Sequence, residues 1–209
     1  MLAPIRTYCY AAAVVPADSH ESRESIIFAV WGLIAHGGIE AVTFRRVAEQ
    51  AEVSVGRVQH HFATREVLVR AACEAMIDIA HAQYQELPDE PLERLRHILV
   101  HAVPDAPEGR IGASVWYAFL AKSADDPEIA RLLAETKRGT EDECARLLAE
   151  IHAREPHPRD TRGDARVLLG LADGLIMRVL VDDLTGDEAR AVLEAELAAR
   201  VANAARHGR

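Results

Sequence analysis

Aromatic residues are scarce in this sequence, and so are segments that alternate between β-branched and polar residues. Aromatics account for 5% of the 209 residues, whereas hydrophobic residues account for 49%. Alanine, leucine, glutamate and arginine dominate, and all four are strong helix formers. Runs rich in glycine or proline are rare as well. The composition therefore favours an all-α fold and argues against a β-sheet.

Cysteine is nearly absent, which limits the chemistry that the chain can carry. Cys9, Cys73 and Cys144 have neither the spacing of a metal site nor that of a disulfide framework. We therefore expect reduced thiols in a cytoplasmic protein, with no bound metal or other cofactor. No stretch is long and apolar enough to span a membrane. Residues 1–20 are interpreted as a disordered leader, and a secretory signal peptide is the alternative.

The sequence has no overall excess of positive charge. The net charge of −9 excludes a chain that is basic throughout. Between His20 and Arg70, however, six arginines and six glutamates cancel, so the acidic excess lies beyond Arg70. A locally neutral segment that carries arginines can still bind DNA through one of its faces.

The motifs of common enzyme classes are not found either. The sequence contains no phosphate-binding loop, no nucleophile elbow and no zinc-protease motif. His60 and His61 are adjacent, so on a helix they point about 100° apart and chelate a metal poorly. His152 and His157 flank a proline loop without a set of cysteines or carboxylates. An enzyme is therefore the least favoured interpretation, and substrate turnover is the observation that would revive it.

Apolar residues at three- and four-residue steps predict helices along most of the chain. Gly37 and Gly38 end the first helix, because glycine accepts the left-handed conformation of a helix C-terminus. Four short polar side chains are predicted to cap the helices that follow them, namely Thr43, Ser54, Thr64 and Asp126. The predicted helices cover residues 23–36, 44–51, 55–62, 64 to about 86, 92–103, 112–124, 126–154, 162–182 and 187–206, with a loop at 155–158.

The segment from Thr43 to Phe62 has the pattern of a helix-turn-helix. Two short predicted helices are joined by the three-residue turn Glu52-Val53-Ser54. Ala48 and Ala51 are small, so the two helices can approach closely. The second helix of such a pair fits the major groove of DNA.

Residues 23–75 resemble the TetR family of transcriptional regulators. The resemblance rests on motifs at the family's spacing: Gly38, Thr43, Val47-Ala48, Val53-Ser54, Gly56, His61-Phe62 and Arg65-Glu66. The segment Leu171–Asp182 resembles the penultimate helix of the family's BetI-like branch. The resemblance implies a three-helix DNA-binding domain at 21–66 and a larger helical domain at 67–209 for ligand binding and dimerisation. It also implies a homodimeric repressor that a small-molecule effector releases from a palindromic double-stranded DNA operator.

Three positions depart from the family pattern. Glu52 stands in the turn where glycine is usual, and a side chain there costs about 1 kcal/mol if the backbone is left-handed. Gln59 replaces the usual tyrosine of the second helix. Arg65 replaces the usual lysine that opens the fourth helix, and arginine can bind a phosphate in a bidentate way.

The chemistry of the motif suggests roles for its residues. Arg57 suits the O6/N7 edge of guanine, Val55 a thymine methyl, and Gly56 a close approach of the backbone to DNA. Gln59 and His60 can reach base edges or phosphates. Phosphate contacts that position the protein are expected from Thr43, Arg45 and Arg65. The full set of predicted DNA-binding residues is Thr43, Arg45, Val55, Gly56, Arg57, Gln59, His60, His61 and Arg65.

The remaining helices provide candidates for a dimer interface and a ligand pocket. An apolar stripe is predicted to form a four-helix seam with a second copy, through Leu132, Leu133, Leu147, Ile151, Leu168, Leu171, Leu175, Ile176 and Val179. Ordinary monomer core is the alternative. Clustered aromatics and polar groups make a candidate pocket of Tyr84, His97, His101, Trp116, Tyr117, Phe119, Asp173 and Met177. Asp173 is the most suggestive, because a buried carboxylate needs a partner, which Arg178, a helix amide or a cationic ligand could supply. A regulator without a small-molecule ligand is the alternative function.

Overall fold

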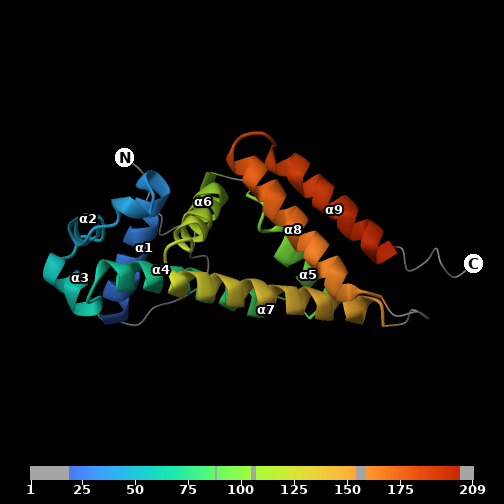
Figure 1. Cartoon of the computed structure of the whole chain (residues 1–209), viewed down its shortest axis with the longest axis horizontal. Helices are drawn as coiled ribbons and strands as arrows, with labels where there is room; N and C mark the ends of the chain where they lie inside the picture. Colours follow the sequence, from blue (N-terminus) through green and yellow to red (C-terminus); the bar gives the residue numbers. More distant parts are fainter. Residues whose placement is uncertain (1–18, 88, 105–106, 154–158, 203–209) are drawn as a thin grey trace, which may run out of the picture. The chain divides into compact units, whose positions relative to one another are not determined.

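In a computed structural model of the chain, every regular element of the described residues is helical (Figure 1). The structure describes residues 19–87, 89–104, 107–153 and 159–202, and no strand occurs within these ranges. The elements are α1 (Ser19–Gly37), the 3₁₀ helix η2 (Ile39–Ala41), α2 (Phe44–Gln50), α3 (Val55–His61), α4 (Arg65–Gln85), α5 (Pro91–Val100), α6 (Pro107–Lys122), α7 (Pro127–Ile151), α8 (Thr161–Leu180) and α9 (Gly186–Ala202). The all-α prediction is confirmed. None of the described helices is long and apolar enough to cross a bilayer.

The ends of the helices differ from the predicted ones by a few residues. Helix α1 already begins at Ser19, so residues 19 and 20 are helical and do not belong to a disordered leader. The rest of the predicted leader, residues 1–18, lies outside the described residues, as do the whole of the predicted loop at 155–158 and the last residues of the helix predicted at 187–206. Helix α6 starts at Pro107, five residues before the predicted start, because its first turns lack the apolar periodicity on which the prediction rests.

The predicted caps are all present. Each of the four side chains accepts a hydrogen bond from the backbone N–H three residues further on: Thr43 at 3.3 Å, Ser54 at 3.1 Å, Thr64 at 3.2 Å and Asp126 at 3.3 Å. An oxygen at this position satisfies one of the N–H groups that a helix leaves without an internal partner. Gly38 follows α1 with a φ of 69° and a ψ of −179°, which differs from the predicted left-handed helical conformation but is likewise adopted almost only by glycine.

The chain packs as two compact units whose boundaries differ from the predicted domains at 21–66 and 67–209. The first unit contains the described residues up to Ile79 together with Ser114–Leu133, and the second contains Ala80–Ala113 and the chain from Ala134 onwards. Helices α4, α6 and α7 each contribute residues to both. The first unit extends beyond residue 66 because α4 continues to pack on α1, where Trp31 Nε1 donates to the Ala72 carbonyl at 2.9 Å.

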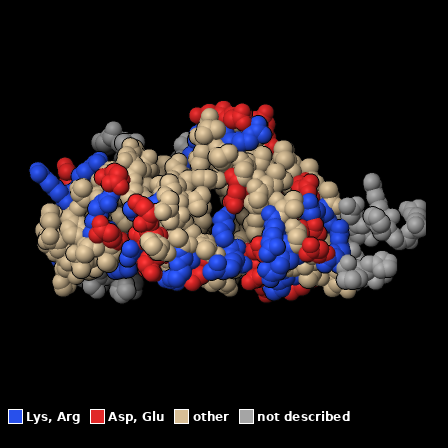
Figure 2. All heavy atoms as spheres, viewed as in Figure 1, with Lys and Arg blue, Asp and Glu red and all other residues tan. Residues whose placement is uncertain are grey.

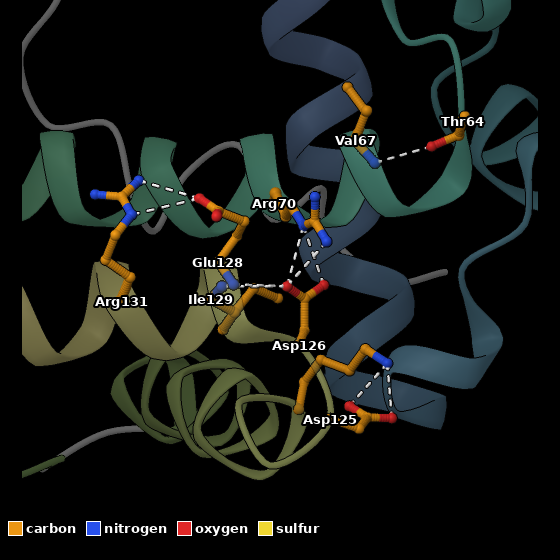
Figure 3. A network of polar contacts seen from close by, with 9 residues as sticks. Thr64, Val67, Arg70, Asp125, Asp126, Glu128, Ile129 and Arg131 are labelled. Atoms are coloured by element: carbon orange, nitrogen blue, oxygen red, sulfur yellow. Dashed lines mark hydrogen bonds and ion pairs between the residues drawn. The ribbon is translucent and has the colours of Figure 1, made fainter.

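An apolar core and one shielded ion pair hold the first unit together. Asp126 at the start of α7 is only 5% exposed, and Arg70 of α4 donates through Nε to both of its carboxylate oxygens at 3.1 Å (Figure 3). Burial by itself would raise the pKa of Asp126. Hydrogen bonds from Arg70 and from the Ile129 and Glu128 amides outweigh burial and hold that pKa below its ordinary value.

In the second unit, the long helix α7 is joined to α8 by a ladder of ion pairs. Lys137 pairs with Asp173 at 2.6 Å, and Arg166 pairs with Glu141 at 3.0 Å. Arg162 adds a contact to Glu141 at 2.8 Å. Going from Lys137 to Glu141 along α7, the partner on α8 moves back from Asp173 to Arg166, so the two helices run antiparallel. Beneath the ladder, a core of fully buried leucines includes Leu95, Leu99, Leu147, Leu148, Leu168, Leu193 and Leu197.

Both described cysteines are buried and unpaired. Cys73 and Cys144 are free thiols, and burial raises the pKa of each to about 12. A thiol that stays protonated at neutral pH is a poor nucleophile and a poor metal ligand. Cys9 lies outside the described residues. These two thiols therefore act as small apolar side chains in the core.

The turn between α2 and α3 carries the strain that the sequence predicts. Glu52 has a φ of 55°, in the left-handed region that favours glycine. The Glu52→Gly variant should gain about 1 kcal/mol in the free energy of unfolding, or roughly 2–4 °C in melting temperature for a chain of this size. Urea unfolding followed by circular dichroism measures this. Glu52→Ala is the matched control, because it removes the charge but keeps a Cβ in the left-handed region. Equal stabilisation by alanine and glycine would trace the cost to charge instead of backbone strain.

Candidate nucleic-acid interface

Helices α2 and α3 form a helix-turn-helix whose interior is apolar. Val47 and Ala48 of α2 are buried together with Val58 of α3 and the following Phe62. In the turn, the Val53 N–H donates to the Ala48 carbonyl at 2.9 Å. These contacts fix α3 on α2 through the small residues and valines of the motif, as the sequence predicts.

The rest of α3 remains open to solvent. Val58 is its one buried residue, while Val55, Gly56, Arg57, Gln59 and His60 are exposed. A Cβ built on Gly56 would meet no atom closer than the Ser54 hydroxyl, at 3.9 Å. Packing within the protein therefore does not require glycine at this position. The backbone at Gly56 is exposed on the open side of α3.

The surface of the first unit carries both signs of charge. Arg45, Arg46 and Arg57 are exposed, and Arg23 lies over the Phe62 ring with its Cζ 5.5 Å from the ring centroid. On the face of the molecule that Figure 2 shows, the lysine and arginine side chains of this unit are interspersed with acidic ones.

The two adjacent histidines of α3 are in different environments. His60 is exposed, whereas His61 is partly buried beside Phe62, and its Nε2 atom finds no hydrogen-bond partner within the described part of the chain. Burial is the main cause that lowers the pKa of His61, and the neighbouring His60 and Arg57 lower it further. Nε2 of His61 faces inward, so any DNA contact by this residue would use Nδ1.

Arg65, predicted to grip a phosphate, is bonded inside the first unit. Its Nε donates to the Val42 carbonyl and its Nη2 to the Ile39 carbonyl, both at 2.7 Å. Nη2 also contacts the Glu40 carboxylate at 3.1 Å. The sequence-based prediction did not include these bonds, which use Nε and Nη2 and orient the guanidinium towards the protein.

The predicted pocket residues are divided between the two units. Trp116, Tyr117 and Phe119 lie in the first, where Phe119 is fully buried and Trp116 packs against the core. The second unit contains Tyr84, His97, His101, Asp173 and Met177. Of these, His97 and His101 are neighbours, with ring centroids 4.6 Å apart. A pocket made by all eight residues stays a prediction.

Three pocket candidates in the second unit have surroundings that the sequence did not reveal. The Asp173 side chain is 49% exposed and accepts from Lys137, so the expectation of a buried carboxylate was wrong. Periodicity places Asp173 in an apolar helix but does not show which face it occupies. Met177 is exposed on α8 as well. The Tyr84 hydroxyl is engaged: it donates to Glu143 and accepts from Arg94 Nε at 3.0 Å.

Most of the residues predicted for a dimer seam are buried within the single chain. Leu133, Leu147, Leu168, Leu175, Ile176 and Val179 are covered by the chain's own helices, so they form the monomer core that was the alternative interpretation. Leu132, Ile151 and Leu171 retain partial exposure. The apolar stripe identified a buried face correctly, but sequence periodicity does not tell whether the covering helix belongs to the same chain or to a partner.

Two family models match this sequence. One, described as "Bacterial regulatory proteins, tetR family", matches residues 26–72, and the other, described as "BetI-type transcriptional repressor, C-terminal", matches residues 91–202. The chain belongs to the TetR family. Both resemblances expected from the sequence, the TetR-type N-terminal segment and the BetI-like C-terminal part, are confirmed.

Individual relatives agree with the assignment to the TetR family. An HTH-type transcriptional regulator BetI of Stenotrophomonas maltophilia (strain R551-3) is 30% identical over 161 residues, which cover 75% of this chain and 80% of that protein. Among solved structures, a TetR-family regulator from Rhodococcus sp. has a TM-score of 0.74 at 27% identity and covers 87% of this chain and 99% of its own. A regulator from Saccharomonospora viridis in complex with choline has a TM-score of 0.74 at 23% identity and covers 85% and 95%.

Membership in the TetR family determines the class of function. The chain is a helix-turn-helix, DNA-binding transcriptional regulator and not an enzyme. The exposed side of α3 lies in the part that matches the TetR N-terminal model. The sequence-based prediction also missed the bonds of Arg65 and the Arg70–Asp126 ion pair. Both join residues far apart in sequence, so no local pattern could have indicated them.

The network around Tyr84 predicts a pH dependence of stability. Hydrogen bonds from Arg146 are the main cause that lowers the pKa of Glu143 to about 2, and burial opposes them. Because the folded-state pKa lies below the ordinary value of 4.5, this contribution is complete above about pH 4.5 and is lost as the pH falls towards 2. We expect Glu143→Gln to cost about 1–2 kcal/mol at pH 7 after allowance for solvent screening.

Urea unfolding at pH 7 and at pH 3 measures this effect. The difference between Glu143→Gln and the wild type should shrink at the lower pH. Tyr84→Phe is the matched variant, because it removes one donor to Glu143 and keeps the ion pair with Arg146, so its effect should be smaller. A cost for Glu143→Gln that is equal at both pH values would contradict the interpretation.

Proposed function

We propose that this TetR-family chain is a repressor that binds a palindromic operator as a homodimer and is released from it by a small-molecule effector. The observation that carries the proposal is the exposed side of α3, with a glycine that its own fold does not require. The matches to TetR and BetI-type regulators support it.

Each exposed residue of the motif suits one kind of DNA contact. Arg57 lies in the first turn of α3, where its backbone N–H is held by Ser54 and its planar fork is free to meet the O6 and N7 acceptors of one guanine. Val55 suits a thymine methyl, and Gln59 and His60 suit base edges or phosphates. Thr43 and Arg45 at the start of α2 suit phosphates, which position the protein without specifying sequence.

The exposed face of α8 is the surface that we propose for the second copy, in place of the buried stripe. Four exposed positions recur on α8 at steps of three and four residues, namely Val167, Gly170, Gly174 and Met177, and the exposed Val181 directly after the helix continues the series. A Cβ at Gly170 or Gly174 would meet no described atom within 4 Å, so the backbone of a partner helix could approach closely. One stripe of this kind can pair with its own copy across a two-fold axis.

An effector is supported by the relatives more than by any single residue of this chain. The Saccharomonospora viridis regulator was crystallised with choline, a small organic cation. In this chain, Asp173 pairs with Lys137, and the Arg94 guanidinium lies 4.3 Å from the centroid of the Tyr84 ring. These two groups are therefore poor first candidates for binding a cation. For effector control, the ligand must bind the released state more tightly than the DNA-bound state.

The alternative is a regulator controlled by a protein partner or by its own abundance. Selection of bound DNA from a random pool identifies the operator and shows whether it is palindromic. A metabolite screen on the operator complex, with choline as the first probe, then separates the two forms of control. Release of DNA by a metabolite favours the effector, and binding that no metabolite weakens favours the alternative.

Arg57 and Arg45 should affect DNA binding in different ways. Arg57→Ala should flatten the base preference at one base pair of each half-site, by about 1–3 kcal/mol of discrimination, with little change in salt dependence. Arg45→Ala should weaken all sequences alike and reduce the slope of log affinity against log salt by about one for each phosphate that the variant no longer neutralises. Fluorescence anisotropy with operator variants at several salt concentrations measures both. A change of base preference in Arg45→Ala, or uniform weakening in Arg57→Ala, would contradict these roles.

The same substitution at two glycines tests the dimer surface. Gly174 on α8 and Gly139 on α7 are both helical and exposed, with no described atom within 4 Å of a built Cβ. Gly174→Glu should place like charges opposite each other across a two-fold interface and convert dimers to monomers at micromolar concentration. Gly139→Glu should leave the dimer intact. Light scattering measures the mass, and dissociation by Gly139→Glu alone would move the interface to α7.

A further inference from the structure

Arg65 connects the first residue of α4 to the segment that leads into α2. In the sequence it follows the reading helix α3 and lies 23 residues after Val42. Its guanidinium contacts the connector between α1 and α2, which consists of Gly38, η2, Val42 and Thr43. The side chain is only 29% exposed.

The bonds that Arg65 makes are those of a two-pronged clamp on backbone carbonyls. Nε donates to the Val42 carbonyl and Nη2 to the Ile39 carbonyl, each at 2.7 Å. A hydrogen bond from a charged donor is about twice as strong as one between neutral groups. The Ile39 carbonyl also accepts from the Val42 N–H at 3.1 Å, so Arg65 uses the second lone pair of that oxygen. The contact with Glu40 is of lesser weight, because that carboxylate is 86% exposed.

The bond from Arg65 to the Val42 carbonyl holds the peptide directly before the cap residue of α2. Val42 precedes Thr43, whose hydroxyl accepts from the Arg46 N–H at 3.3 Å and caps α2. A hydrogen bond to the Val42 carbonyl fixes the plane of the peptide that joins Val42 to Thr43. Helix α2 in turn supports α3 through Val47 and Ala48. The orientation of the reading helix therefore depends on a connector that Arg65 holds in place.

We infer that Arg65 is a positioning residue, which strengthens DNA binding by holding the start of α2 against α4 and not by contacting a phosphate. This inference rests on the proposed DNA-binding function. The planar fork of arginine offers donors on two nitrogens, Nε and Nη2, to two carbonyls in a fixed geometry. The ammonium of lysine has its three donors on one nitrogen and does not reproduce that geometry. A phosphate contact, in contrast, needs only positive charge at that position.

Arg65→Lys separates the two roles, and Arg65→Ala completes the series. If Arg65 acts as a clamp, both variants lower the melting temperature of the full chain by about 3–8 °C. Both also weaken operator binding by ~10-fold because the reading helix is less well preorganised. Neither changes the slope of log affinity against log salt. Arg45→Ala is the reference for a phosphate contact, and Glu40→Gln is expected to shift the melting temperature by less than about 1 °C, as for an exposed pair.

The inference is overturned if Arg65→Lys keeps the stability and affinity of the wild type while Arg65→Ala lowers the salt slope by about two per dimer. Hydrogen exchange gives a readout that does not depend on DNA. The amides at the start of α2, including Arg46, should exchange faster in Arg65→Lys than in Glu40→Gln, and equal rates also overturn the clamp. If wild-type protein selects no operator from a random pool, the proposed function fails, while exchange and melting still decide the role of Arg65.

Discussion

Helices α2 and α3 have seven residues each, which is too short for either to be stable alone. Their conformation depends on side chains from elsewhere in the first unit and on caps at their ends. Val47, Ala48 and Val58 provide the apolar contacts, and Thr43 and Ser54 provide the caps. The reading helix is thus as rigid as the packing beneath it, and the placement of the exposed residues on α3 is a property of the whole unit.

Several charged side chains of this protein join one helix or connecting segment to another. Arg70 with Asp126, Lys137 with Asp173 and Arg65 with two carbonyls each connect residues that are distant in sequence. Several predicted contacts with ligand or DNA involve groups that the chain already uses in this way. A cation or carboxylate that stands out in a sequence therefore identifies a polar partnership, but not whether the partner is internal or external.

The two faces of α8 illustrate the same ambiguity for apolar residues. The stronger stripe, which includes Leu168, Leu175 and Val179, is buried in the protomer. The weaker one, which includes Gly170 and Gly174, stays exposed and is glycine-rich. Glycine adds almost no hydrophobicity, so it does not stand out in the apolar periodicity of the sequence. Close approach of two backbones is nevertheless the contact for which glycine is best suited.

The sequence by itself determined the all-α class, the caps, the helix-turn-helix with its strained Glu52, and membership in a family of DNA-binding regulators. Those features depend on local patterns: apolar spacing, short polar side chains before helices, and a motif of twenty residues. Only the tertiary structure decided that Asp173 pairs with Lys137, that Tyr84 is bonded to Glu143, and that Arg65 holds the carbonyls of Ile39 and Val42. Each of these contacts joins residues more than twenty positions apart. Their choice of partner depends on how helices pack, and no local pattern contains that information.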